Sequence, residues 1–290
     1  MKIIKKIDSI KSYGDIVFVP TMGALHEGHL SIVEEAKKWN LPICMSIFVN
    51  KLQFNNKSDF EQYPRDIDRD IIIAKETGVK ILFLPESEYL YEHKNFSIIS
   101  SGKLGMELEG KSRPGHFDGV LSIVDILLQL VQPKYAIFGK KDAQQFYLIS
   151  SILRKRHRKV NFLATQTVRE LDGLALSSRN ALLSSSSRKE SVGIFECLKF
   201  VAEDILKNKD INSSIQKGKM YLQKYSGIVL DYLVVVDSET FKPPIESTKT
   251  FQLLIAVIID GVRLIDNISF YTSKDEYEID FGIDLNGEKF

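Results

Sequence analysis

The chain has 290 residues, of which 44% are hydrophobic, enough for one large core or two smaller ones. Its 39 Lys and Arg nearly balance its 38 Asp and Glu, which argues against general attraction to nucleic acid or membranes and requires a local pocket for any anion. Two distant cysteines form no disulfide framework. With no signal-peptide pattern and no run of about 18 apolar residues, we expect a cytoplasmic globular protein.

Short apolar runs alternate with helical patterns in the first half of the chain. The predicted strands are 16–19, 43–49, 81–84, 135–138 and 160–165, and the predicted helices are 30–39, 66–77, 119–131 and 142–156. Continuously apolar strands separated by helices are typical of a parallel sheet covered on both faces, the doubly wound α/β class. In such sheets ligands bind at the carboxyl ends of the strands, where the strand order reverses.

The pattern changes after about residue 167. Two helical stretches, 187–207 and 211–225, precede strands at 229–237, 251–259 and 262–268, the last two joined by a hairpin signal at Asp260-Gly261. We predict a Rossmann-like domain over 1–167 and a smaller α+β domain over 168–290. The acidic stretch 271–290 is either an edge strand or a loose tail.

The first candidate site motif is PTMGALHEGH, residues 20–29, between the first strand and the first helix. Gly23 and Gly28 allow close approach of the backbone to a ligand, and the helix N-terminus favours phosphate. His26 and His29 can lie on one side of the first turn and donate to ATP phosphates as charge develops. The alternative is a pair of histidines that only cap the helix. A zinc site is a weaker interpretation, because no third candidate ligand lies at the spacing of a zinc motif.

Two later motifs also suit an anion. Gly139-Lys140-Lys141-Asp142 precedes a helix, where Lys141 can reach a phosphate and Asp142 either accepts ribose hydroxyls or caps the helix. Leu176-Ser177-Ser178-Arg179-Asn180 is a hydroxyl-rich loop with a cation that could close on ATP, although serine-rich loops often have no ligand.

Three further segments give weaker indications of a binding site. Asn50 and Gln53 follow the second strand and suit a small polar acid, or are ordinary loop residues. Arg113 and His116 precede a buried helix and could bind a carboxylate. The basic run 154–159 lies at a helix C-terminus, where the dipole favours cations, so a solvated face is expected there instead of a nucleic-acid site.

Together these runs resemble the pantothenate synthetase (pantoate–β-alanine ligase) family of His-x-Gly-His nucleotidyltransferases over residues 1–268. The resemblance rests on PTMGALHEGHL, SIFVN followed by QF, YPRD, EGKSRPGHFDGV, KDAQQ, VRELDGLALSSRN and RLIDNI. It implies ATP-dependent ligation of pantoate and β-alanine through a pantoyl adenylate, with release of AMP and pyrophosphate. It also implies Mg²⁺ with the ATP, a cytoplasmic homodimer, and a small second domain that acts as a lid over the ATP- and pantoate-binding domain.

By similarity, His29 is the proton donor. We predict His26 and Lys141 as further catalytic residues, because they can supply positive charge to the ATP phosphates. The implied ATP-binding residues are Met22, Gly23, Ala24, Leu25, His26, Glu27, Gly28, His29, Gly139, Lys140, Lys141, Asp142, Val168, Leu176, Ser177, Ser178 and Arg179. The implied substrate residues for pantoate and β-alanine are Gln53 and Gln145, to which the loop chemistry adds Asn50, Arg113 and His116.

The chain departs from the family pattern in four places. Lys51-Leu52 replaces the usual Pro-Thr, Lys140 replaces Glu or Gln, Asp125 replaces a frequent Lys, and the residues after about 270 have no clear counterpart. Two alternatives remain open at this stage. One is another adenylyl- or cytidylyltransferase of the same fold; the other is a non-catalytic ATP sensor, which would be expected to lack at least one phosphate-site cation.

Overall fold

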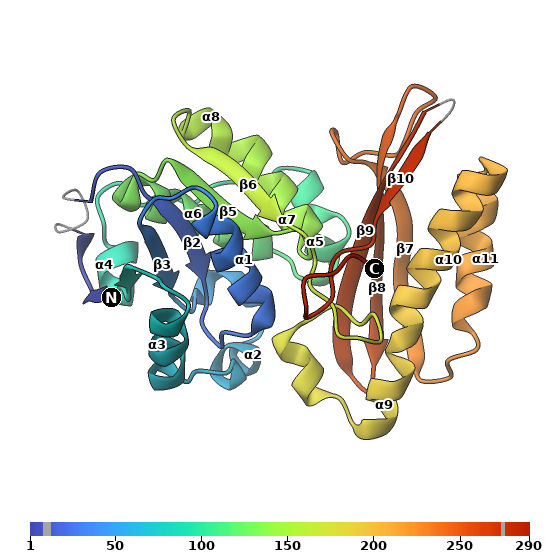
Figure 1. Cartoon of the computed structure of the whole chain (residues 1–290), viewed down its shortest axis with the longest axis horizontal. Helices are drawn as coiled ribbons and strands as arrows, with labels where there is room; N and C mark the ends of the chain where they lie inside the picture. The colour runs from blue at the N-terminus through green and yellow to red at the C-terminus, as the bar shows by residue number, and fades with distance from the viewer. Residues whose placement is uncertain (8–12, 274–275) are drawn as a thin grey trace. The chain divides into compact units, whose positions relative to one another are not determined.

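The computed structural model describes residues 1–7, 13–273 and 276–290, which fall into two compact units (Figure 1). The first unit comprises residues 1–140 and 144–165, and the second comprises residues 141–143 and 166–290. Residues 141–143, at the start of helix α7, therefore group with the second unit although their neighbours on both sides belong to the first.

A six-stranded parallel sheet forms the centre of the first unit. Its strands are β1 (Lys2–Ile4), β2 (Val17–Thr21), β3 (Ile43–Ile47), β4 (Ile81–Phe83), β5 (Tyr135–Gly139) and β6 (Asn161–Thr165), in the spatial order β1-β4-β3-β2-β5-β6. The chain moves outward from β2 through β3 and β4 and then returns to β5 on the other side of β2. The strand order thus reverses between β2 and β5, and the predicted doubly wound α/β class is confirmed.

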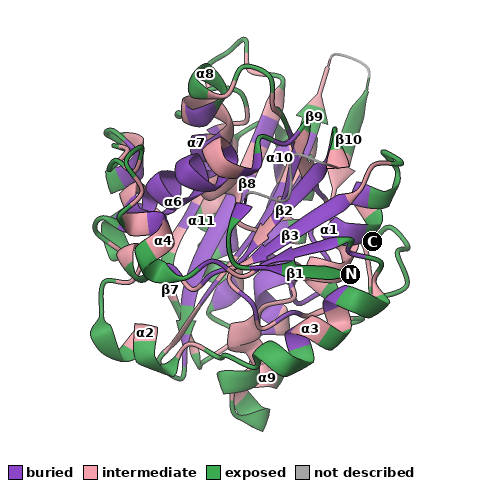
Figure 2. Cartoon of the chain, turned by 90° about the vertical axis from the view of Figure 1, so that its left-hand side faces the viewer, coloured by how far each residue is buried: buried purple, intermediate pink, exposed green. Residues whose placement is uncertain are grey.

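Helices cover both faces of this sheet. The α-helices in this part of the chain are α1 (Glu27–Lys37), α2 (Lys57–Gln62), α3 (Ile67–Glu76), α4 (Ser87–Tyr91), α5 (Glu109–Ser112), α6 (His116–Val131), α7 (Ala143–Leu148) and α8 (Arg154–Arg156), of which α1 and α6 pack against opposite faces. Successive side chains of β2 enter different cores because strand residues alternate between faces. Phe18 packs in the cluster that contains much of α6, whereas Val17 and Val19 pack with residues of α1. Figure 2 shows the buried strands between these layers.

The predicted helix 142–156 is wrong as a single α-helix. A π-helical segment (Ile149–Leu153) separates α7 from α8. The hydroxyl of Ser150 donates to the carbonyl of Tyr147, and that of Ser151 donates to the carbonyl of Leu148. Such local bonds compete with the regular α-helical ladder, and the β-branched residues beside them have a lower helix propensity.

The second unit is an antiparallel sheet with two long helices. After α9 (Ser185–Glu190) come α10 (Val192–Asn208) and α11 (Ile211–Leu222), then β7 (Ile228–Asp237), β8 (Thr250–Ile259), β9 (Val262–Thr272) and β10 (Tyr277–Asp280), in the order β10-β9-β8-β7. Asp260 and Gly261 have φ angles of 53° and 75°, as a type I′ hairpin turn requires. The predicted α+β class and hairpin are confirmed, and part of the acidic stretch forms the edge strand β10.

In the described part of the chain, no helix is both long enough and apolar enough to cross a membrane.

Buried Asp125 on α6 ties that helix to the basic run at 154–159. Its carboxylate accepts two hydrogen bonds from Arg156 (2.8 and 3.0 Å), one from Gln129 (2.8 Å), and lies 2.7 Å from Nε2 of His157. The other four residues of the basic run are exposed, as the solvated-face interpretation expects. Burial disfavours the charged form, but the bonds from His157, Arg156 and Gln129 outweigh it and lower the pKa of Asp125 to about 2.

We predict that Asp125→Asn lowers the free energy of unfolding by about 2 kcal/mol at pH 7. Because the folded-state pKa is depressed, the stabilisation is complete above the ordinary aspartate pKa near 4 and is lost as the pH falls toward about 2. Urea unfolding of the wild type and the variant between pH 7 and pH 3 measures this difference. Asp15→Asn, which breaks an exposed ion pair with Lys134, is the control and should change little. A difference independent of pH would contradict the assignment.

Candidate active site

The loop between β2 and α1 is held by a buried carboxylate from α3. Gly23 and Ala24 both have positive φ angles, 83° and 51°. The two oxygens of Asp70 accept hydrogen bonds from the backbone N–H groups of Ala24 (2.9 Å) and Leu25 (2.8 Å). A Cβ atom on Gly23 would lie 2.8 Å from Asp70 and 2.9 Å from Ile47, so only glycine fits this position without a shift.

Sequence reasoning missed Asp70, although its side chain shapes the predicted ATP loop. A weak signal was present: Asp70 lies one turn before the fully buried Ala74 on α3, so its side chain points toward the core. A carboxylate on a buried helix face needs donors, and the loop amides after β2 supply them.

His26 and His29 cap α1 reciprocally. His26 is the N-cap residue, and its Nδ1 accepts the N–H of Gly28 (3.1 Å); Nδ1 of His29 accepts the N–H of His26 (3.3 Å). The two rings are 4.2 Å apart between centroids. The capping interpretation is therefore correct as far as it goes, and both imidazoles perform the role that Ser and Glu have in an ordinary capping box.

This capping also assigns the tautomer of each ring. An Nδ1 atom that accepts a hydrogen bond carries no proton, so a neutral imidazole in this arrangement holds its proton on Nε2. Each ring can then donate from Nε2 while its Nδ1 remains bound to the helix start. The first turn of α1 therefore offers two orientated side-chain donors at the carboxyl end of β2, beside the point of strand reversal.

Asn50 and Gln53 lie together at the end of β3, around the short helix η3 (Lys51–Gln53). Asn50 is fully engaged: its Oδ1 accepts from Leu52 N and Tyr91 Oη, and its Nδ2 donates to Gly119 O and to Oε1 of Gln53. Both side chains are buried. Asn50 thus shapes the loop and orientates the Gln53 amide through its Oε1.

Arg113 and His116 reach the same loop from the start of α6. His116 Nδ1 lies 2.8 Å from the carbonyl oxygen of Gln53, and Arg113 Nη2 donates to the same oxygen (3.3 Å). Arg113 Nη1 is 3.2 Å from His116 Nε2. The structure therefore brings four of the five predicted substrate residues together: Asn50 bonds the side chain of Gln53, and Arg113 and His116 contact its backbone carbonyl.

Tyr91 is a further residue of this loop that the sequence did not reveal. Its hydroxyl accepts the N–H of Lys51 (3.2 Å) and donates to Asn50 Oδ1 (2.9 Å). Burial raises the pKa of Tyr91 to about 12, so the hydroxyl remains a donor at neutral pH. Nζ of Lys51 lies 4.9 Å from the centre of the Tyr91 ring, so the residue that replaces the usual proline also packs on this tyrosine.

Adjacent glutamines on α7 have different environments. Gln144 is buried; it accepts from Glu109 N (3.1 Å) and donates to the carbonyls of Leu104 and Glu107 (2.8 and 3.0 Å). It fixes the 104–109 segment against α7. Gln145, the predicted substrate residue, is half-buried on another side of the helix. The sequence pair Gln-Gln therefore combines a buried, structural amide with a half-buried one.

The Gly139–Asp142 motif follows β5, across the strand reversal from β2. Gly139 ends β5, and the N–H of Lys140 donates to Thr165 O (2.9 Å). In the second unit, Nζ of Lys141 lies 3.6 Å from the carboxylate of Asp142, so Asp142 partly balances the cation that is expected to meet phosphate.

Residues 168–179 form a narrow turn followed by a short helix in the second unit. Arg169 pairs with Ala175, and the N–H of Leu176 donates to Val168 O (2.9 Å). Ser177 caps the helix η6 (Ser178–Leu182) by accepting the N–H of Arg179 (3.2 Å). The loop predicted from its serines therefore has a defined backbone and includes the half-buried Arg179.

The family model described as pantoate-beta-alanine ligase matches residues 2–269. The chain belongs to the pantoate–beta-alanine ligase family. Pantothenate synthetase from Lysinibacillus sphaericus is 41% identical over 91% of this chain and 93% of its own length, and that from Thermotoga petrophila is 38% identical over 92% and 99%. The family prediction and the prediction of an enzyme, a ligase, are both confirmed, and the ATP-sensor alternative is set aside.

Solved structures of this ligase family agree with the fold. Pantothenate synthetase from Thermus thermophilus superposes with a TM-score of 0.86 at 36% identity, covering 92% of this chain and 98% of the other. Pantoate-beta-alanine ligase from Francisella tularensis, described as complexed with beta-gamma ATP and beta-alanine, gives a TM-score of 0.74 at 34% identity, covering 92% and 97%. These matches favour this family over the other nucleotidyltransferases that share His-x-Gly-His.

We predict that Asp70→Asn lowers the free energy of unfolding by about 2–3 kcal/mol. The asparagine oxygen can accept only one of the two loop amides, and its NH₂ group faces the other N–H. Urea unfolding at pH 7 measures the loss. Asp68→Asn, at an exposed position on the same helix, is the matched control and should leave stability nearly unchanged. Equal stability of the two variants would show that Asp70 does not hold the loop.

Proposed function

We propose that this ligase joins pantoate to β-alanine in two steps that share one ATP. A carboxylate oxygen of pantoate attacks the α-phosphorus, which forms pantoyl adenylate and releases pyrophosphate. The amine of β-alanine then attacks the acyl carbon and releases AMP with formation of the amide bond of pantothenate. Family membership and the ATP-bound state described for the Francisella tularensis relative support this reaction.

The observation that carries the proposal is the reciprocal capping of α1 by His26 and His29. It gives two Nε2–H donors at a helix N-terminus, next to the reversal of strand order. Anionic phosphate is favoured there by the positive end of the helix dipole. Fixed donors stabilise the charge that develops on the phosphates without a protein nucleophile, so positioning and electrostatics suffice.

We assign the remaining ATP contacts to the predicted motifs. In the first unit these are Met22 to His29 with Gly139 and Lys140; in the second they are Lys141, Asp142, Val168 and Leu176 to Arg179. Lys141 and Arg179 supply positive charge for the phosphates. His29 is the proposed proton donor and His26 a phosphate contact. The first unit is the proposed ATP- and pantoate-binding domain, and the second the proposed lid domain.

We assign substrate selection to Gln53 and Gln145. Their amides suit the hydroxyl and carboxylate groups of a small hydroxy acid. Asn50, Arg113 and His116 act in this proposal mainly by fixing the backbone and amide of Gln53, because their bonds are made to the same loop. A pocket built on orientated amides discriminates against acids that lack the matching hydroxyl groups.

Mg²⁺ enters this proposal as a complex with ATP. Among the described residues, no group of three or more His, Cys, Asp and Glu side chains is placed to hold a metal. Mg²⁺ commonly takes most of its ligands from phosphates and water, with few from protein, so the nucleotide itself would carry it. We further propose that the protein is cytoplasmic and forms a homodimer. Sedimentation of the purified chain would test the oligomeric state.

We predict that AMP formation from ATP requires both pantoate and β-alanine, and that pantoate alone supports only pyrophosphate exchange into ATP. A coupled AMP assay and an isotope-exchange assay measure the two steps separately. Related hydroxy acids without the pantoate hydroxyl pattern are the control substrates. Absence of pantoate-stimulated AMP release would overturn the proposed function.

We predict that His29→Ala lowers the single-turnover rate of adenylate formation by about 10²-fold or more. This variant loses both the imidazole donor and its capping bond. His29→Gln separates the two effects, because Gln at the third helical position restores the capping box without an imidazole. We expect it to fold with wild-type stability and to remain slow.

His26→Asn is the corresponding variant at the N-cap, where asparagine is a preferred residue. It should keep α1 capped and weaken ATP binding more than it slows the chemical step. A wild-type rate in His29→Gln would show that His29 serves only as a cap.

A further inference from the structure

Residues 277–290, which we call the tail segment, lie beyond the part of the chain that the family model matches, residues 2–269. The Thermotoga petrophila relative is matched over 99% of its own length but over only 92% of this chain. Despite this, the tail segment is built into the second unit: β10 pairs with β9, and Ile283 forms a parallel bridge with Val168. It therefore contacts a segment that we assign to ATP.

The backbone contacts surround Val168 on both sides. The N–H of Arg169 donates to Ile283 O (2.8 Å), and the N–H of Ile283 donates to Thr167 O (3.0 Å). The carbonyl of Val168 accepts the N–H of Leu176 (2.9 Å). Val168 thus lies in a strand-like segment between Leu176, another proposed ATP residue, and the tail segment.

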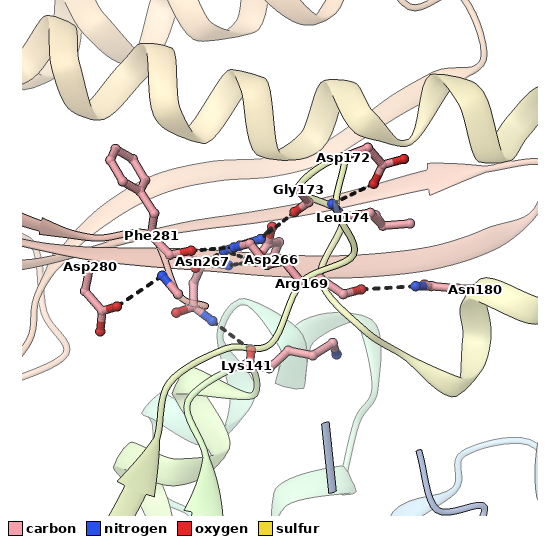
Figure 3. Close-up of polar contacts among 12 residues, drawn as sticks. Lys141, Arg169, Asp172, Gly173, Leu174, Asn180, Asp266, Asn267, Asp280 and Phe281 are labelled. Carbon is pink, nitrogen blue, oxygen red and sulfur yellow. Dashed lines mark hydrogen bonds and ion pairs between the residues drawn. The ribbon is translucent and has the colours of Figure 1, made fainter. Parts of the chain in front are cut away.

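Arg169 anchors this arrangement in the interior. It is 0% exposed, forms a bidentate ion pair with Asp266 (2.6 and 3.0 Å), and donates to the carbonyls of Gly173 and Asn267 (Figure 3). Its Nε donates to the carbonyl of Phe281 in the tail segment. A buried guanidinium needs an acceptor for each of its N–H groups. The tail segment supplies one of these acceptors, the carbonyl of Phe281.

The same cluster extends to Lys141. Asn267, the neighbour of Asp266, donates from Nδ2 to the carbonyl of Lys141 (2.7 Å). Figure 3 shows this bond beside the Arg169–Asp266 pair. One connected set of hydrogen bonds therefore links the tail segment, the backbone at Val168 and the backbone of a proposed phosphate-binding lysine.

Apolar contacts fix the tail segment further along. The Phe195 ring on α10 lies 6.0 Å from that of Phe281 and 5.3 Å from that of Phe290, between centroids. The Arg169 guanidinium carbon is 4.3 Å from the Phe195 ring centre. Next to Phe281 in the chain, the Asp280 carboxylate accepts a hydrogen bond from the side chain of Gln166 (2.9 Å).

We propose that the tail segment is a positioning element for ATP, which sets the affinity for the nucleotide by holding Val168 directly and Lys141 through the Arg169–Asp266–Asn267 cluster. This inference rests on the proposed function for the assignment of Val168, Leu176 and Lys141 to ATP. The tail segment needs no contact with ATP itself, because a backbone held in its bound conformation loses less entropy on binding.

Two glycines of the tail segment provide a matched test. Gly282 has a φ angle of 93°, and a Cβ atom there would lie 2.3 Å from Thr167 O. Gly287 has a φ angle of 83° and no atom within 4 Å of such a Cβ. Alanine at either position carries the same left-handed backbone penalty, but only Gly282→Ala pushes the tail segment away from residues 167–169.

The experiment measures ATP binding to the full chain by titration calorimetry, together with the KM for pantoate and hydrogen exchange at the amides of Arg169 and Ile283. We expect Gly282→Ala to weaken ATP binding about fivefold or more and to speed exchange at both amides, with the KM for pantoate nearly unchanged. Gly287→Ala should resemble the wild type in all three measurements.

Faster exchange in Gly282→Ala with unchanged ATP affinity would overturn the proposal, as would an equal loss of affinity in Gly287→Ala. If Gly282→Ala does not fold, Asp280→Ala, which removes the bond to Gln166 without added bulk, is judged by the same criteria. A wild type that binds ATP without pantoate-dependent AMP release would refute the proposed function alone, because calorimetry still tests the tail segment.

Discussion

The buried carboxylate of Asp70 is the constraint on which the candidate site depends. Two consecutive residues with positive φ angles, Gly23 and Ala24, turn the chain from β2 toward α1. Their strained backbone persists because the amides of Ala24 and Leu25 donate to the one carboxylate of Asp70. The position of that turn determines where α1 begins. The start of α1 in turn determines which way His26 and His29 point, so the geometry of the proposed catalytic donors is set by a residue that need not touch any substrate.

The second unit relies on a different kind of anchor. Arg169 and Asp266 form a fully buried ion pair, which is costly to desolvate and is stable only when further hydrogen bonds satisfy it. Backbone carbonyls from the turn at Gly173, from β9 and from the residue after β10 provide those bonds. A cluster that draws on so many segments keeps them in register with one another. Apolar packing alone specifies such register less strictly, since hydrophobic contacts are not directional.

The parts of the structure that could be predicted from sequence are local. Apolar runs marked strands β2 to β6, and Asp260-Gly261 marked a hairpin, because each signal lies within the element it forms. The three-residue edge strand β1 lay among lysines and was missed. Asp70 binds an amide 45 residues away, Asp125 meets Arg156 across 31 residues, and Arg169 meets Asp266 across 97. Such pairs depend on the finished fold, so no spacing in the sequence indicates them, and the same holds for the different roles of Gln144 and Gln145.

The capping of α1 by two histidines has a consequence for how such a chain could lose its activity. In the proposed mechanism, fold and chemistry share the same four ring nitrogens: Nδ1 of each ring caps the helix, and Nε2 donates to ATP. Selection for stability alone would accept the ordinary capping residues at these positions, Ser, Asp or Asn at 26 and Glu or Gln at 29. A relative that carries such a pair would keep a well-formed nucleotide-binding fold without its donors. Under the proposed mechanism, this substitution pattern would identify a pseudoenzyme within the family from its sequence.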